Sequence, residues 1–204
     1  MSKKITTNQH NGHEFVEIGG IKWATCNVGA EKPTDFGLYF QWGDRKGYTA
    51  DEVCKIKMFD LDTYKHYKGK GFTKYNKFDG KHVLDLCDDA AFAYMGQGWR
   101  MPTNDDFRCL SENATYSWTN SYCLSRVPGM VFTDRTDNTK ELFLPAAGYY
   151  HRNKNRCIGT DGFYWNNSCL NTNGCYINFC YGGLGIYGIC NRIFGFSVRG
   201  ILID

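Results

Sequence analysis

Cysteine is the residue type with the most chemical potential in this chain, since ten cysteines occur among 204 residues. A zinc site or a redox pair requires cysteines or histidines at short, regular spacings. The chain has no CxxC motif, and none of its five histidines lies at ligand spacing from a cysteine. The sequence therefore predicts mostly free, partly buried thiols that pack as small apolar groups, with no metal and no other cofactor.

Acid–base catalysis would need a carboxylate or a histidine beside a nucleophile. Asp88–Asp89 and Asp105–Asp106 are adjacent carboxylate pairs, but each lies near the start of a helix-forming run, where carboxylates favour the first turn. His151 follows two tyrosines, and the sequence places no partner beside it, which predicts a histidine on a surface loop. GxSxG, P-loop and HExxH motifs are missing from the sequence. We therefore expect a protein that is not an enzyme.

Length and charge narrow the class of protein further. A chain of 204 residues fits one domain, and a net charge of +3 is too small to indicate a nucleic-acid partner. No apolar run approaches the roughly 18 residues that a membrane span needs, so membrane insertion is not expected. The first fifteen residues lack an apolar core, so no signal peptide is predicted. The oligomeric state stays open.

The order of the expected elements indicates an α+β domain. Alternating residues predict strands on both sides of Gly19–Gly20, a strand at 36–43, and a hairpin from 129–133 and 140–146. Helices are expected at 83–96 and from Thr103, which can cap the second helix. Residues 1–11 are expected to form a polar arm before a single domain at 12–204. Residues 44–82, rich in Lys and Tyr, are interpreted as a solvated insertion whose tyrosines pack on the domain.

Residues 166–194, here called the low-charge segment, hold four cysteines and a single charged side chain, Arg192. Residues 166–200 contain no Lys, Glu, Gln, Met or Trp and only two charged residues, where average usage would give roughly eight or nine. Within 176–180, strand alternation predicts that Ile177 and Phe179 face the core and that their neighbours point outward.

Five motifs, in order, carry a resemblance to a known family: "GIKWATCNVGAEKPTDFGLYFQWGD", "DDAAFAYMGQGWRMPTNDDF", "LFLPAAGYY", "GFYWNNS" and "GFSVRG". The chain resembles the major paralogous (FISUMP-like) domain of gut Bacteroidetes and the variable proteins of diversity-generating retroelements. The resemblance covers most of residues 12–200 and is weakest over 44–82. It implies a C-type lectin-like fold, with two early helices, short irregular antiparallel strands and a loop-rich C-terminal binding face.

The resemblance also implies that the low-charge segment is diversified by mutagenesis of adenines in Asn codons. Changing the first two bases of such a codon gives Asn, Ser, Gly, Cys, Tyr, Ile, Leu, Phe and Thr, but none of the five missing residue types. The expected ligand-binding positions are Asn167, Cys169, Asn171, Asn173, Tyr176, Asn178, Cys180, Tyr181, Gly183, Gly185, Tyr187, Gly188, Ile189, Cys190, Asn191, Ile193 and Phe194. The expected scaffold positions are Trp23, Trp99, Arg100, Trp165, Ile177, Phe179, Phe196 and Arg199.

The implied function is binding of a protein or glycan on a bacterial or host surface. Such an adhesin or receptor-binding protein would sit on a phage tail or, through another module, on a bacterial surface. An uncharged surface predicts binding that depends weakly on salt, and an exposed thiol in it would be prone to oxidation. Two alternatives stay open: a cysteine oxidase similar to the formylglycine-generating enzyme, using Cys175 and Cys180, and a structural domain without a ligand. Calcium-directed glycan binding is disfavoured, since Trp165-Asn166-Asn167 has no upstream Glu/Gln-Pro-Asn/Asp partner.

Overall fold

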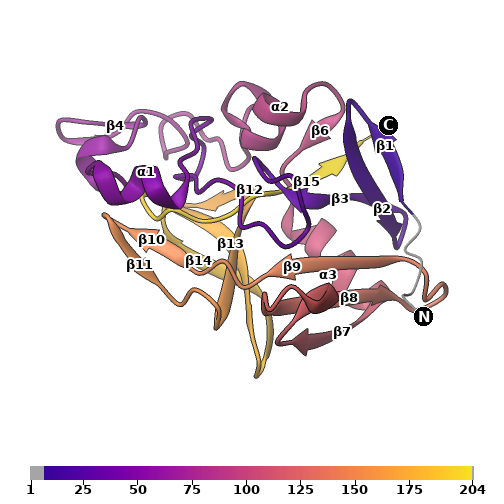
Figure 1. The fold of residues 1–204 in the computed structure, drawn as a ribbon. Helices are drawn as coiled ribbons and strands as arrows, with labels where there is room; N and C mark the ends of the chain where they lie inside the picture. Colours follow the sequence, from indigo (N-terminus) through magenta and orange to yellow (C-terminus); the bar gives the residue numbers. More distant parts are fainter. Residues whose placement is uncertain (1–6, 204) are drawn as a thin grey trace.

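The computed structural model describes residues 7–203, which form a mixed α and β fold built mainly from antiparallel strands (Figure 1). The largest sheet has five strands in the order β1-β2-β3-β15-β6. Strands from the two ends of the chain therefore lie side by side, with β15 between β3 and β6. The bounds are β1 Asn8–His10, β2 His13–Ile18, β3 Ile21–Asn27, β6 Trp99–Arg100 and β15 Arg199–Leu202.

Two three-stranded antiparallel sheets, β7-β8-β9 and β12-β13-β14, complete the framework. Two small hairpins, β4-β5 and β10-β11, extend from it. The bounds of the first sheet are β7 Ala114–Thr119, β8 Gly129–Asp134 and β9 Glu141–Pro145. Those of the second are β12 Asp161–Leu170, β13 Asn173–Cys180 and β14 Gly183–Asn191. The hairpin strands are β4 Tyr67–Lys68, β5 Gly71–Phe72, β10 Tyr149–His151 and β11 Lys154–Arg156.

The described helices are short, and none of them has the length and apolar character needed to cross a membrane. The α-helices are α1 Ala50–Lys55, α2 Ala90–Met95 and α3 Asn104–Asn113. Three 3₁₀ turns occupy Leu61–Thr63, Leu86–Asp88 and Tyr122–Leu124. Thr103 caps α3 in a capping box with Asp106, which confirms the predicted start of that helix.

Strand alternation divides the core between the two faces of the five-stranded sheet. Phe15 and Ala24 pack on one face with α2, Trp165 and Phe196. Residues of the opposite phase, Val16, Ile18 and Trp23, pack on the other face with α3, β8 and β9. The two-residue period of a strand produces this division, since successive side chains point to opposite faces. The turn at Gly19–Gly20 requires positive φ at both residues (60° and 78°), as the sequence predicted.

The insertion at 44–82 packs on the domain mainly through aromatic rings. Tyr48, Tyr64 and Tyr75 are buried, which confirms the expectation that the tyrosines of this region pack inward. Tyr48 and Phe59 form a third core cluster with Tyr39 and Tyr150. The insertion also contains helix α1, which the sequence analysis did not predict.

A buried charge network holds the second half of the insertion. The Asp88 carboxylate accepts hydrogen bonds from the ammonium groups of Lys65 and Lys74 and from the Tyr75 hydroxyl, and His66 Nε2 lies 3.7 Å from it. The prediction that Asp88 belongs to the first turn of the helix was wrong, because Asp88 ends a 3₁₀ turn and Asp89 is the residue that caps α2. Asp88 neutralises cations that the insertion carries into a buried site.

Two other expectations need correction. Residues 8–10 of the predicted polar arm form β1 and pair with β2; residues 1–6 lie outside the described part. Residues 36–43 form only isolated bridges, Tyr39 with Tyr48 and Phe40 with Phe196. The four aromatic side chains of this run pack against different elements, so its backbone does not pair with a single neighbouring strand throughout.

Candidate functional site

The low-charge segment folds almost entirely into strands. β12 and β13 are joined by the two-residue turn 171–172, and β13 and β14 by the turn 181–182. Asn171 adopts a φ of 54°, a left-handed conformation that asparagine tolerates. The expectation of a loop-rich C-terminal face was therefore wrong. The alternation of apolar and polar residues is strong enough to form long strands with tight hairpins.

Three of the predicted surface positions are buried, and we remove them from the candidate site. Asn167 is 6% exposed, because its backbone joins Pro102 and Leu84 through hydrogen bonds of 2.8 and 2.9 Å. Cys169, also 6% exposed, belongs to the core cluster around Trp165. Ile193 is 7% exposed and follows the buried Arg192.

The remaining predicted positions lie at the surface to two different extents. Six are exposed: Asn171, Tyr181, Gly185, Tyr187, Ile189 and Asn191. Eight are half-buried: Asn173, Tyr176, Asn178, Cys180, Gly183, Gly188, Cys190 and Phe194. In β14, exposed residues alternate with half-buried ones from Gly185 to Asn191. The exposed large side chains of β14 and its preceding turn are Tyr181, Tyr187 and Ile189, at 82%, 63% and 50%.

Four half-buried rings form what we call the aromatic patch: Tyr149, Phe163, Tyr176 and Phe194. Tyr149 lies 4.9 Å from Phe163 and 5.7 Å from Phe194, and Phe163 lies 5.9 Å from Tyr176, between ring centroids. The buried ring of Phe196 lies beneath all four, at centroid distances of 5.1 to 6.1 Å. The patch is therefore a preformed apolar surface supported by the core.

Two glycines of β14 leave space for side chains of β13. Tyr176 pairs with Gly188, and a Cβ atom at residue 188 would lie 2.5–2.8 Å from the Tyr176 ring. Asn178 pairs with Gly185, whose Cβ would meet the Asn178 amide oxygen at 2.8 Å. A register shift between Tyr176 and Asn178 places both glycines opposite these side chains. The conformations of Tyr176 and Asn178 therefore depend on which residues occupy 188 and 185.

Three of the four cysteines of the segment are poorly suited to redox chemistry. All ten cysteines of the chain are free thiols, and Cys169 and Cys175 are buried. Burial raises the pKa of the Cys169, Cys175 and Cys190 thiols, which keeps them protonated and unreactive. The expected oxidation risk within the segment therefore does not apply to these three residues.

Cys175 and Cys180 do not form a catalytic pair. Both lie on β13, five positions apart, which separates them by about 16 Å along a strand and points them to opposite faces. Cys175 is buried, while Cys180 is half-buried near the hairpin turn. The arrangement required of a cysteine oxidase is not present at these two residues.

The tripeptide Trp165-Asn166-Asn167, considered above as a calcium ligand, forms hydrogen bonds within the protein. The Asn166 side chain donates to the Asn104 amide oxygen and accepts from the Ser168 backbone N–H. Asn166 is fully buried, and its backbone carbonyl accepts from the Trp42 indole at 2.8 Å. These oxygens of Asn166 already accept hydrogen bonds from donors within the protein.

The predicted scaffold residues lie in or against the core. Trp23, Trp99, Trp165, Ile177, Phe179, Phe196 and Arg199 are each at most 2% exposed, and Arg100 is half-buried in an ion pair with Asp106. Arg199 donates to the backbone carbonyls of Ala24 and Phe143, at 2.8 and 3.0 Å. Burial lowers the pKa of Arg199. The guanidinium joins β15 to β3 and β9, so its role is structural.

Arg192 connects the low-charge segment to the insertion. Its guanidinium donates to the backbone carbonyls of Tyr75 (2.8 Å) and Asn171 (2.7 Å) and lies 4.7 Å from the Trp42 ring centroid. Arg192 is fully buried and has no carboxylate partner among the described residues. It is therefore a positioning residue that fixes the β12–β13 turn against the insertion.

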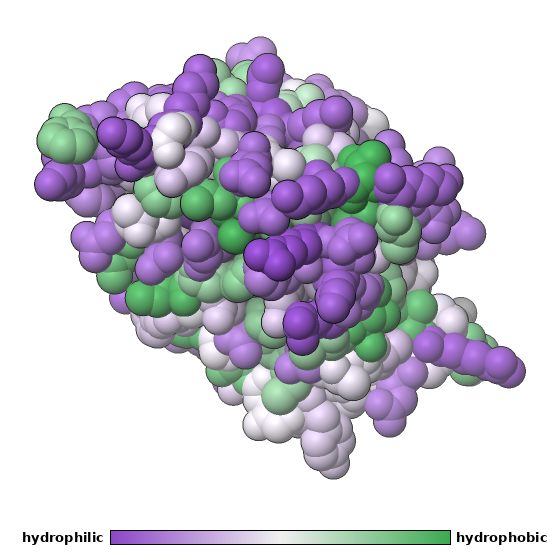
Figure 2. All heavy atoms as spheres, turned by 90° about the vertical axis from the view of Figure 1, so that its left-hand side faces the viewer, coloured by the Kyte–Doolittle hydropathy of each residue, from purple (hydrophilic) through white to green (hydrophobic). Residues whose placement is uncertain are grey.

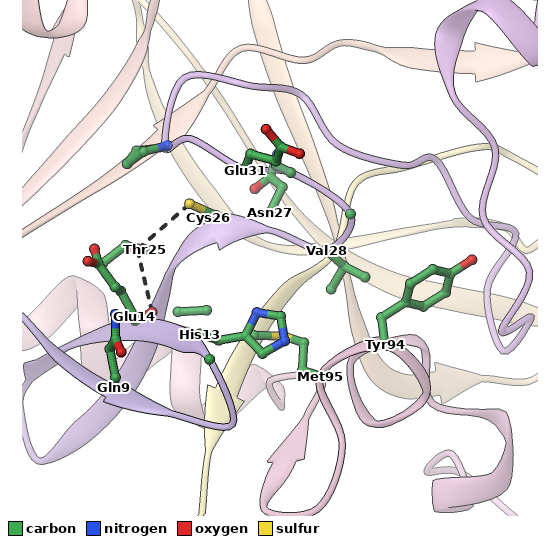
Figure 3. Close-up of a pocket in the computed structure, with 15 residues that line it drawn as sticks. Gln9, His13, Glu14, Thr25, Cys26, Asn27, Val28, Glu31, Tyr94 and Met95 are labelled. Carbon is green, nitrogen blue, oxygen red and sulfur yellow. Dashed lines mark hydrogen bonds between the residues drawn. The ribbon is translucent and has the colours of Figure 1, made fainter.

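A pocket of about 510 Å³ lies elsewhere, between β2, β3, the loop that follows β3, and α2 (Figure 3). Glu14, Thr25, Cys26 and Glu31 contribute polar groups to its lining, and the Thr25 hydroxyl donates to the Glu14 carbonyl at 3.4 Å. Burial raises the pKa of Cys26, so its thiol is a poor nucleophile. No residue of the low-charge segment lines this pocket.

One cluster has the residue types of a metal site: Asp85, Cys87 and Asp88, whose ligand atoms lie within 4.8 Å of one another. Its carboxylates already bind ammonium groups, since Lys74 contacts both and Lys81 contacts Asp85 at 2.6 Å. The cluster is therefore better explained as the charge network of the insertion than as a metal site.

Sequence reasoning missed part of the surface. Tyr149 and Phe163 complete the aromatic patch but lie outside the low-charge segment. His151 is not on a loop: it lies in β10 and its ring packs 4.8 Å from that of Phe194. The alternation in "GYYH", with Tyr150 buried between Tyr149 and His151, could have indicated a strand with these two residues on one face.

Comparisons with protein-family models, with curated proteins and with solved structures found no match.

Proposed function

We propose that the protein is a ligand-binding protein, whose binding surface is the exposed part of the β12–β14 sheet together with the aromatic patch. The observation that supports this best is the combination of composition and position in β13 and β14. Uncharged side chains of a few types fill the surface positions, while fixed apolar residues, Ile177 and Phe179, anchor the same strands in the core. Binding surfaces built on rigid scaffolds have this division.

The energetic roles of the exposed residues follow from their chemistry. Tyr181 and Tyr187 are large side chains with few rotatable bonds, so ordering them on binding costs little entropy. Asn171 and Asn191 can each donate and accept hydrogen bonds. Ile189 adds apolar area that a partner would bury. Gly185 leaves room for the Asn178 side chain, whose amide can also donate and accept hydrogen bonds.

We infer from the resemblance that this surface is diversified by a retroelement on a C-type lectin-like fold. The shared sheet of the N- and C-terminal strands, with α2 and α3 on opposite faces, supports such a fold. Diversification accounts for the missing Lys, Glu, Gln, Met and Trp and for the four cysteines without a partner. The carrier would be a phage tail or a bacterial surface, and the partner a surface protein or glycan.

A surface variant tests the binding proposal without disturbing the core. Tyr181→Ser, Tyr187→Ser, Ile189→Ser and Asn191→Ser are combined in one chain, and Tyr116→Ser, at an exposed tyrosine of β7, is the control. We expect the combined variant to lose retention on intact bacterial or host cells, measured by flow cytometry, while the control binds like the wild type. Equal retention of all three proteins would contradict the proposal.

The gene sequence tests diversification separately. We expect codons that end in a pyrimidine at the six exposed positions, a nearby template repeat with AAY at the same codons, and a reverse transcriptase gene. A gene without such a repeat would reject the retroelement while leaving the binding proposal to the cell assay.

A further inference from the structure

Positive charge collects on one side of the molecule. The insertion at 44–82 contains ten basic and six acidic residues, a net charge of +4, and the β10–β11 hairpin adds three basic and no acidic residues. The whole chain carries +3, so all the other residues together carry −4. α1, β4, β10 and β11 lie on the same side of the fold (Figure 1), and hydrophilic side chains cover much of that side, with apolar areas between them (Figure 2).

The hairpin joins this basic side to the aromatic patch. Tyr149 pairs with Arg156, and His151 pairs with Lys154. Tyr150 exchanges backbone hydrogen bonds of 2.9 and 2.8 Å with Gly195, which lies between Phe194 and Phe196. The patch and the cations of β11 are therefore parts of one continuous surface.

The cations of the hairpin differ in their availability. Arg152 is occupied, because its Nε lies 3.3 Å from Asp60 and its backbone N–H donates to Phe59. Lys154 and Arg156 are exposed, and neither has an ion-pair partner within residues 7–203. They are free to bind an anion that lies across the patch.

We propose that the ligand is an acidic glycan, with its sugar rings on the aromatic patch and its anionic groups on Lys154 and Arg156. This inference rests on the proposed function and names the ligand class for the same surface. A sugar ring presents apolar C–H groups on its faces and hydroxyl groups at its edges. The apolar patch matches the ring faces, and the amide of Asn178, which can both donate and accept, matches the hydroxyls.

The same surface is less suited to single-stranded nucleic acid. Base stacking requires open ring faces along a basic groove that follows the phosphates. Here the four rings are half-buried and tilted against their patch neighbours by 43° to 69°, so they do not offer a stack of parallel faces. The free cations of the hairpin lie at one border of the patch and do not follow it.

Binding of the full chain to immobilised polymers tests the inference. Polygalacturonate and dextran sulfate are the acidic probes; methyl-esterified polygalacturonate and dextran are the neutral probes with the same backbones. We expect binding to at least one acidic polymer, none to its neutral match, and about tenfold weakening between 50 and 500 mM NaCl, because screening acts on exposed charges. The sequence alone predicted weak dependence on salt, so this result would also reverse that expectation.

Lys154→Gln combined with Arg156→Gln should weaken binding to the acidic polymer about fivefold, as expected for two exposed ion pairs. Arg135→Gln, an exposed arginine in the turn between β8 and β9 at the opposite end of the fold, removes a charge elsewhere and should change nothing. Thermal unfolding confirms that each variant is folded.

Three results would overturn the inference: no binding to either acidic polymer, equal binding to a neutral match, or equal or tighter binding to poly-L-glutamate or to a dT20 oligonucleotide. The proposed function is judged independently. If the Tyr181/Tyr187/Ile189/Asn191 variant loses cell binding while Lys154→Gln/Arg156→Gln keeps it, the surface binds a ligand and the acidic glycan is wrong.

Discussion

The low-charge segment and the insertion at 44–82 have opposite compositions and opposite modes of attachment. The first, with one charged residue in 29, is anchored by strand alternation, which buries Ile177 and Phe179. The second, with sixteen charged residues, is held by buried tyrosines and by the Asp88 network. The difference teaches that a segment anchored by its own alternate residues can vary its outward positions freely, whereas a segment anchored by charge pairs cannot.

The low-charge segment and the insertion meet at Arg192, so we expect its replacement to lower the free energy of unfolding more than the substitutions that follow. We expect Arg192→Met to lower the free energy of unfolding by about 3 kcal/mol, because the carbonyls of Tyr75 and Asn171 lose charged donors in a buried site. Arg192→Lys keeps the charge but loses the planar guanidinium with its several donors. Its free energy of unfolding should lie between those of the wild type and Arg192→Met. Urea unfolding measures both; a loss below about 0.5 kcal/mol for Arg192→Met would show that the regions are not coupled there.

Asp88→Asn tests whether charge pairs hold the insertion. Burial alone would raise the pKa of Asp88, but the bonds from Lys65, Lys74 and Tyr75 hold it well below its usual value. We expect a loss of about 2 kcal/mol at pH 7, because Lys65 loses its carboxylate partner and Lys74 keeps only Asp85. Hydrogen exchange should increase in 60–82 and not in β13. Increased exchange in β13 as well would contradict the separate anchoring of the two regions.

Gly188→Ala tests how far positions within the low-charge segment vary independently. The added Cβ would meet the Tyr176 ring at 2.5–2.8 Å, so the ring must move, at a cost of about 1 kcal/mol. Tyr176→Ser should remove that cost, and the double variant should be less destabilised than the sum of the single changes. Additive effects in this double-mutant cycle would show that the two positions are not coupled.

The pH dependence of stability should come from the insertion. Burial lowers the pKa of His66 below its ordinary value near 6.5, although Asp88 opposes this shift. The unfolded chain therefore takes up the proton first, and the contribution of His66, complete above about pH 6.5, declines as the pH falls. His66→Gln should reduce the change in the free energy of unfolding between pH 5 and pH 7. An unchanged slope would show that another titratable group causes the pH dependence of stability.

The smallest effect on stability is expected at the exposed positions of the low-charge segment. The Tyr181/Tyr187/Ile189/Asn191 serine variant should unfold within about 0.5 kcal/mol of the wild type per substitution, because these side chains contribute little to the core. Ile177→Ser, at a buried position of the neighbouring strand β13, is the contrasting control. If the surface variant were as unstable as Ile177→Ser, the segment would be structural and not a tolerant surface.

The sequence by itself determined the elements whose pattern is local. Gly19–Gly20, the Thr103 cap, the hairpin of β8 and β9, and the burial of Ile177 and Phe179 each follow from residues close together in the chain. The mixed α and β class follows from the order of these elements. Periodicity and turn chemistry act over a few residues, so they can be read without the rest of the fold.

Only the tertiary structure decided which residues of the low-charge segment are exposed and which other residues share their surface. Asn167, Cys169 and Ile193 have the same residue types as their exposed neighbours, yet contacts with distant parts of the chain bury them. Tyr150 pairs with Gly195, 45 positions away, which brings Tyr149 beside Phe194, and the register of the β10–β11 hairpin then adds the cations of β11. Burial and charge proximity depend on such long-range packing, which no local pattern specifies.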